Sequence, residues 1–364
     1  MNANLAREYY VRHDGGFDKF VAQLNCLQTA LYFVLRCKTG IAEPYELFTQ
    51  DPSYCLELDA EGRYRQLRLS ESWQCFEVFQ THDVKGRGEA TLAEIEAMLD
   101  AGEIVLFETF LNRVPHMTGF IALDFPYEPA RHDLPHNHIF VALGHTDTHL
   151  YYGEAPVLLN ANYVPYRNRR DIGLIEKSVL RHAMDCFLHY RRVEIKEDGL
   201  RHNRQLRVTA VIRSLLDHAA RPRQELPTGG MVYYGADALD KLADCCRSGA
   251  FAMNRPSTVY ESKEGQVLEW RASLIRQQKT LLYRCIQRNP ELFGDDTPAL
   301  LGTLKQSSDA WQTALSRVRL MLLKQQEDTT ALQSLIVKMK ACDQQFLEAA
   351  ERWYARAGAG VTAG

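Results

Sequence analysis

The sequence lacks three features that would each assign a chain to a class at once. It has no apolar run near the roughly 18 residues of a membrane span. Its 43 Lys and Arg stand against 46 Asp and Glu, and the net charge of −3 gives no electrostatic attraction to nucleic acid or to an anionic membrane. Residues 1–16 lack the apolar core of a signal peptide. We therefore expect a cytoplasmic protein with neither nucleic acid nor a membrane as partner.

Cysteines are present, but none forms a CxxC pair, and their number is odd. Both facts argue against a disulfide framework and against a cysteine-rich zinc site. Most of the thiols are therefore expected to be reduced, buried and inert. The nine are Cys26, Cys37, Cys55, Cys75, Cys186, Cys245, Cys246, Cys285 and Cys342.

The first half of the chain mixes helix and strand. Helical periodicity covers residues 18–36, and Thr91 with Glu94 forms the capping box of a short helix over 91–100. Apolar runs at 103–110 and 117–125 predict strands, and a hairpin follows. This order predicts an α+β domain with an antiparallel sheet over residues 1–195.

The second half is dominated by helical patterns, so residues 196–364 are predicted to form a helical domain that covers the first domain or binds a partner. Breaks at Pro222, Pro227 and the Asn289-Pro290 pair separate the helices. The expected helices span residues 204–219, 237–246, 265–288, 298–325 and 328–357.

The most informative pair of residues lies in the predicted hairpin. Residues 139–143 and 148–152 form its two strands. With a turn centred on Thr146, His138 faces Glu154, and opposed side chains have Cβ atoms about 5 Å apart. A carboxylate at that distance can orient an imidazole, as the acid of a catalytic triad does. A third metal ligand, His136 or His149, would instead make this a metal site; no metal is expected, because no HExxH motif accompanies the pair.

Cys26 is the candidate nucleophile, because residues 25–36 place it at or near the start of a helix. The helix dipole and the unpaired N–H groups there stabilise a thiolate and can hold an oxyanion. The alternative is that Cys26 is a small apolar side chain of an amphipathic helix.

Over residues 15–160 these motifs resemble a known family. A cysteine at the head of an early helix precedes His138-x-hydrophobic-x-x-x-Gly144 and then an acid close to Pro156. This order is similar to the papain-like cysteine peptidases that trim bacteriocin leaders. The stretch Leu123-Asp-Phe-Pro-Tyr127, followed by His132, His136 and His138, resembles more specifically the N-terminal domain of the butirosin biosynthesis protein H-like family.

The resemblance implies an acyl or aminoacyl transferase of natural-product biosynthesis with a papain-like fold. Such an enzyme moves an acyl group from a carrier-protein thioester, through an acyl-Cys26 intermediate, to an amine. The implied partners are an acyl carrier protein (peptidyl carrier protein), whose phosphopantetheine arm presents the acyl group, and a small amine; no bound cofactor is implied. The catalytic residues would be Cys26, His138 and Glu154, with oxyanion or substrate-positioning roles for Gln23, Asn25, Tyr127 and His136.

The sequence departs from the family pattern at two places. Glu154 stands where the relatives carry Asp, and Ala155 separates it from Pro156. Phe20 occupies the usual place of an oxyanion glutamine, so Gln23 or the N–H of Cys26 would have to supply that donor. Two other functions stay open: a cysteine peptidase or amidohydrolase with the same triad, and a non-catalytic module that binds a carrier protein.

Overall fold

We describe the protein from a computed structural model. The structure describes residues 20, 24–41, 44–71, 73, 78–83, 91–110, 137–153, 164–166, 169–184, 189–201, 204–258 and 262–361. Among these residues, no helix combines the length and apolar character needed to cross a membrane.

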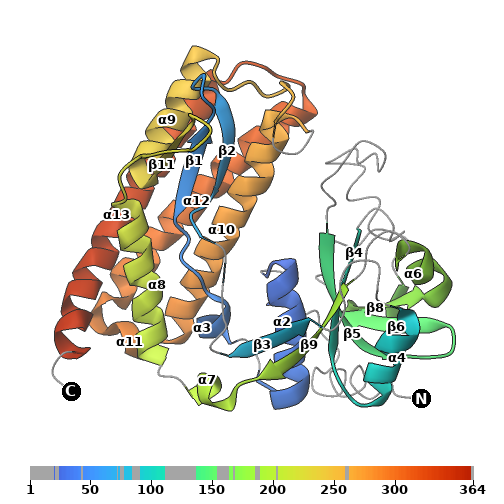
Figure 1. The fold of residues 1–364 in the computed structure, drawn as a ribbon. Coiled ribbons are helices and arrows are strands. Elements are labelled where there is room, and N and C mark those ends of the chain that lie inside the picture. The colour runs from blue at the N-terminus through green and yellow to red at the C-terminus, as the bar shows by residue number, and fades with distance from the viewer. Residues whose placement is uncertain are drawn as a thin grey trace. The chain divides into compact units, whose positions relative to one another are not determined.

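The chain forms two compact units, shown in Figure 1. The first consists of the residues up to Pro44 together with Cys75–Arg201, and the second of Tyr45–Gln74 together with the residues from His202 onward. Residues 45–74 therefore belong with the C-terminal half, whereas the sequence suggested an uninterrupted first domain over 1–195. The cause is strand pairing, because the hairpin at 54–69 extends into a larger sheet through residues 231–234.

The first unit contains an antiparallel sheet of seven strands in the order β3-β9-β4-β5-β6-β8-β7. This confirms the α+β class with an antiparallel sheet that the sequence predicts. The strands are β3 (Phe79–Asp83), β4 (Val105–Phe110), β5 (Asn137–His145), β6 (His149–Gly153), β7 (Val164–Tyr166), β8 (Arg169–Glu176) and β9 (His189–Ile195). The helices are α2 (Cys26–Thr39), α4 (Leu92–Asp100), α6 (Lys177–Met184) and α7 (Glu197–Arg201).

Helices cover both faces of this sheet (Figure 1). On one face, α2 packs so closely that a Cβ on Gly153 of β6 would lie 2.8 Å from the ring of Phe33. On the other face, His145 at the end of β5 contacts Asp100 of α4, with 3.0 Å between Nε2 and Oδ1. On the same face, Lys177 of α6 forms an ion pair with Glu96 of α4.

The ends of α4 follow directly from its sequence. Thr91 accepts a hydrogen bond from the N–H of Glu94, whose carboxylate accepts in return from the N–H of Thr91. This is the capping box that the sequence predicts. After the helix, Gly102 adopts a φ of +82°, a conformation that costs glycine little.

The second unit combines long helices with a four-stranded antiparallel sheet in the order β10-β11-β1-β2. The predicted helical character of this half is confirmed, but its sheet was not predicted. The strands are β1 (Tyr54–Leu58), β2 (Tyr64–Leu69), β10 (Gln224–Glu225) and β11 (Met231–Tyr234). The helical elements are α3 (Tyr45–Phe48), α8 (Arg204–Ala219), α9 (Gly235–Ser248), α10 (Glu264–Arg288), α11 (Pro290–Phe293), the 3₁₀ turn η4 (Gly294–Asp296), α12 (Thr297–Leu323) and α13 (Thr330–Val361).

The core of the second unit contains a buried carboxylate. Asp343 of α13 accepts hydrogen bonds from the Tyr54 hydroxyl at 2.7 Å, the Ser307 hydroxyl at 2.5 Å and the Trp311 indole at 3.0 Å. Lys279 of α10 forms an ion pair with it at 3.1 Å. These groups are buried, so the cluster connects β1, α10, α12 and α13 inside an otherwise apolar core.

Candidate active site around Cys26

Cys26 is the first residue of α2 and is partly exposed. The side-chain oxygen of Asn25 accepts from the N–H of Gln28 at 2.8 Å, and the Gln28 side chain accepts from the N–H of Asn25 at 3.0 Å. The first backbone hydrogen bond of the helix is donated by the N–H of Thr29 to the carbonyl of Asn25, at 2.7 Å. The N–H groups of Cys26 and Leu27 come before it, in the first turn, where N–H groups have no partner within the helix. The expected position of Cys26 at a helix start is therefore confirmed, and Asn25 serves there as the cap.

The remaining described cysteines are packed differently. Burial raises the pKa of the Cys55 and Cys245 thiols to about 11 and that of Cys246 to about 12. Cys37 and Cys285 are also buried, and Cys342 is partly exposed in the middle of α13. Cys75 and Cys186 lie outside the described residues. Within the described residues, Cys26 alone combines partial exposure with a helix N-terminus.

The helix that begins at Cys26 runs in the same direction as β5. Ala142 of β5 and Arg192 of β9 both pair antiparallel with Val105 of β4, so β5 and β9 are parallel and these two residues lie at one level. Thr39, the last residue of α2, lines a cavity of about 690 Å³ together with Ile195, the last residue of β9. The C-terminal ends of α2, β5 and β9 therefore share one end of the sheet.

It follows that Cys26 and His138 share the opposite end. From Thr39 back to Cys26, α2 extends about 20 Å at a rise of about 1.5 Å per residue. From His145 back to His138, β5 extends about 23 Å at about 3.3 Å per residue. The two lengths match, and Phe33 of α2 lies against Gly153, the partner of Val141, so a helix aligned with β5 would start near the level at which the strand begins. The cavity at Thr39 lies at the far end of the sheet from Cys26 and is not part of this site.

The two faces of β5 can be told apart by their contacts. Val141 pairs with Gly153, which faces α2, and opposed residues point to the same side of a sheet. Phe140 and Ala142 alternate with Val141 and therefore face away from α2. The side chain of His138 lies outside the described atoms.

The expected register of the hairpin was wrong. Val141 pairs with Gly153 instead of Tyr151, and a bulge between Ala142 and Gly144 changes the register before His145 pairs with Leu150. The turn is centred later than Thr146, so the described pairs do not follow the register from which the pair of His138 and Glu154 was predicted. Register is set by the turn and by bulges, and the sequence pattern did not reveal this one.

The other residues assigned to the site lie outside the described residues: Gln23, Tyr127, His136 and Glu154. Among the described residues, no three His, Cys, Asp or Glu side chains form a group able to hold a metal ion. His145 was expected in the turn but is the last residue of β5, where Lys177 donates to its Nδ1 at 3.2 Å. His149 is partly buried at the start of β6 and contacts Thr148.

Comparison of the chain with models of known protein families finds no match, and comparison with curated proteins finds none either.

Proposed function

We propose that the chain is a cysteine-dependent acyl or aminoacyl transferase of natural-product biosynthesis, with a papain-like first unit and Cys26 as nucleophile. The observation that carries the proposal is the position of Cys26, partly exposed at the first residue of an Asn-capped helix. The location of α2, which starts at the end of the sheet where the His138-bearing strand begins, adds support.

In the first half-reaction, the Cys26 thiolate attacks the carbonyl carbon of a carrier-protein thioester. The N–H groups at the start of α2 are placed to stabilise the oxyanion. The carbon–sulfur bond to the phosphopantetheine arm then breaks, and the departing thiolate takes the proton that the His138 imidazolium holds. One thioester replaces another, so the step is close to thermoneutral.

In the second half-reaction, an amine attacks the acyl-Cys26 carbonyl and loses its proton to His138. The bond between the acyl carbon and Cys26 breaks, and an amide is released. A third group, for which Glu154 is the candidate, would orient the imidazole. Amide formation from a thioester is downhill, and exclusion of water from the acyl-enzyme would favour the amine over hydrolysis.

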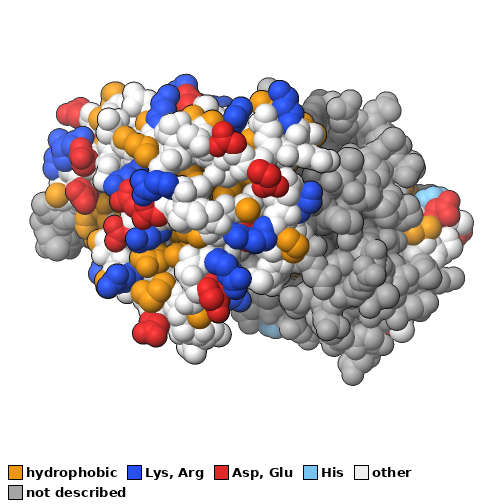
Figure 2. All heavy atoms as spheres, turned by 90° about the horizontal axis from the view of Figure 1, so that it is seen from above, with side chains coloured by type: hydrophobic (Ala, Val, Ile, Leu, Met, Phe, Trp, Pro, Cys, Tyr) orange, Lys and Arg blue, Asp and Glu red, His pale blue; other side chains and the backbone are white. Residues whose placement is uncertain are grey.

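The partner proposed for this reaction is an acyl carrier protein. An acidic carrier would favour a basic rim, for which the sequence offers residues 167–170, 191–192 and 201–204. Arg192 is exposed, but it contacts Glu194 at 2.6 Å. On the face shown in Figure 2, Lys and Arg side chains of the second unit alternate with Asp and Glu.

A second candidate is a module that binds a carrier protein without catalysis. The register of β5 and β6 favours it, because the described pairs differ from the register on which the predicted pair of His138 and Glu154 depends. A peptidase or amidohydrolase with the same residues differs from the transferase only in what attacks the acyl-enzyme.

Intact-protein mass spectrometry with simple acyl thioesters tests these alternatives. We expect a single acyl adduct on the native protein and on Cys342→Ala, which removes the other partly exposed described cysteine, but none on Cys26→Ala. An adduct that persists on Cys26→Ala would refute the proposal. A native protein that forms no adduct would favour the binding module.

Adding amines to the acylated protein separates transfer from hydrolysis. Amide product from one or a few amines, formed faster than free acid, supports the transferase; free acid alone supports the hydrolase. His138→Ala should slow acylation by a factor of about 10²–10⁴. Unchanged acylation would remove His138 from the mechanism.

A further inference from the structure

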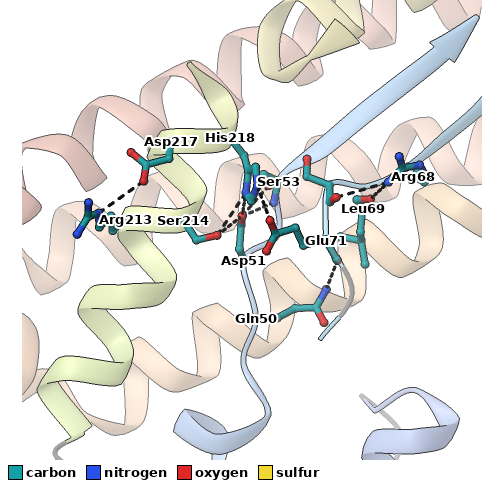
Figure 3. A network of polar contacts seen from close by, with 11 residues as sticks. Gln50, Asp51, Ser53, Arg68, Leu69, Glu71, Arg213, Ser214, Asp217 and His218 are labelled. Carbon is teal, nitrogen blue, oxygen red and sulfur yellow. Dashed lines mark hydrogen bonds and ion pairs between the residues drawn. The ribbon is translucent and has the colours of Figure 1, made fainter. Parts of the chain in front are cut away.

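A buried histidine of the second unit lies between two carboxylates (Figure 3). His218, in the last turn of α8, places its Nδ1 2.5 Å from Oδ2 of Asp51 and its Nε2 3.0 Å from Oε1 of Glu71. Ionised carboxylates only accept hydrogen bonds, so both ring nitrogens must carry protons to satisfy both contacts. The geometry therefore selects the imidazolium.

The two carboxylates are held to different degrees. Asp51 is buried and also accepts from the Ser53 N–H at 2.7 Å, the Ser53 hydroxyl at 2.7 Å and the Ser214 hydroxyl at 3.0 Å. The side chain of Glu71 is 61% exposed. Asp51 is thus fixed in place, whereas Glu71 can exchange its contact with His218 for water.

The charges around His218 favour its protonated form. The hydrogen bond that His218 donates to Asp51 raises the pKa of His218, and the negative charges of Asp51 and Glu71 add to that effect. Burial and the positive charge of Arg221 act in the opposite direction. On the exposed side of α8, Asp217 pairs with Arg213 at 3.6 Å instead (Figure 3).

The position of the cluster in the chain gives it a consequence. Asp51 lies between α3 and β1, and Glu71 lies just after β2, so the two carboxylates flank the β1–β2 hairpin. Both flanks are thereby fastened to α8. The same segment, residues 45–74, is the part of the chain that leaves the first unit and returns to it.

We propose that His218, Asp51 and Glu71 form a proton-dependent clamp on residues 45–74. With His218 protonated, both flanks of the hairpin are held on α8. When Nε2 gives its proton to water, its lone pair faces the Glu71 carboxylate, and the exposed Glu71 flank is released while Asp51 stays bound to Nδ1–H. Because the pKa of His218 is raised on folding, the clamp is closed below the ordinary histidine pKa and opens as pH rises through the folded value.

Hydrogen exchange across a pH series tests the clamp. Protection of the residues next to Glu71, corrected for intrinsic exchange, should fall as pH rises, by about tenfold for each unit by which the pKa of His218 is raised. His218→Gln should abolish this pH dependence. Asp217→Asn, on the exposed side of the same helix, should leave it intact and is the matched control.

Glu71→Gln provides a second variant that keeps the shape of the site. An amide can accept from a protonated Nε2 or donate to a neutral one, so the flank should stay protected at all pH values. A histidine NMR titration of the whole protein gives the direct readout. The clamp is refuted if His218 titrates at or below about 6.5. It is also refuted if His218→Gln and the native protein show the same pH dependence of exchange. Should His218→Gln fail to fold, the Glu71→Gln variant and the titration provide the test.

Discussion

Replacement of Asp343 by Asn should strongly destabilise the second unit. The carboxylate compensates the buried Lys279 and accepts from the donors of Tyr54, Ser307 and Trp311. The amide of the Asp343→Asn variant would leave the ammonium of Lys279 without a counter-charge and would present a nitrogen donor toward other donors. Removing one partner of a buried ion pair costs about 3–5 kcal/mol, and we expect a loss in that range.

Tryptophan fluorescence during urea unfolding measures this loss of stability in the second unit. All four tryptophans belong to the second unit: Trp73, Trp270, Trp311 and Trp353. The matched control is Asp309→Asn, which removes a pair with Lys305 in which both side chains are more than 60% exposed; such surface pairs contribute little to stability. A cost for Asp343→Asn no larger than that of the control would refute the reasoning. A double variant with Lys279→Met should recover much of the loss.

Three further outcomes are expected. Gly153→Ala should lower the free energy of unfolding of the first unit by about 1–3 kcal/mol, because the new Cβ would overlap the Phe33 ring, and circular dichroism melts would show it. Asn25→Ala should lower the free energy of unfolding of the first unit by about 1 kcal/mol, because the helix cap is lost. The same variant should slow the alkylation of Cys26 by iodoacetamide. The second unit should lose stability above about pH 10, the ordinary tyrosine pKa, because burial raises the pKa of Tyr54 well above that value and folding then favours the protonated phenol.

Each of these expectations has its own control. Gly302→Ala, on an open face of α12, should instead stabilise by about 0.5–1 kcal/mol, and a loss there equal to that of Gly153→Ala would remove the overlap argument. Asn25→Asp preserves a capping oxygen and should restore helix stability. Tyr54→Phe should flatten the alkaline limb, so an unchanged limb would assign it to other groups.

Local sequence signals predicted the helices well. The predicted bounds 204–219 coincide with α8, and the capping box at Thr91 and Glu94 appears as expected. The long helices α10, α12 and α13 lie within a few residues of their predicted bounds. These features depend on periodicity and on caps, which neighbouring residues determine.

What the sequence missed depends on contacts between distant residues. Leu56 pairs with Tyr233, and His218 contacts Asp51 across 167 positions. No local sequence pattern indicates such pairs, so neither the pairing of β1 with β11 nor the His218 cluster was predicted. The predicted hairpin register was wrong mainly because the turn lies further along the chain than Thr146, and the bulge after Ala142 then changes the register by one residue.

The place of β1 in the second unit also bears on how the chain is made. Its partner strand β11 begins at Met231, about 175 residues after β1. At synthesis rates of about 5–20 residues per second, β1 would wait on the ribosome for about 10–35 s before β11 emerges. During that interval its edge and the apolar face of the β1–β2 hairpin have nothing from the second unit to pair with. Any fragment that ends before residue 231 would keep this hairpin in the same unpaired state permanently, with the aggregation hazard of an open strand edge.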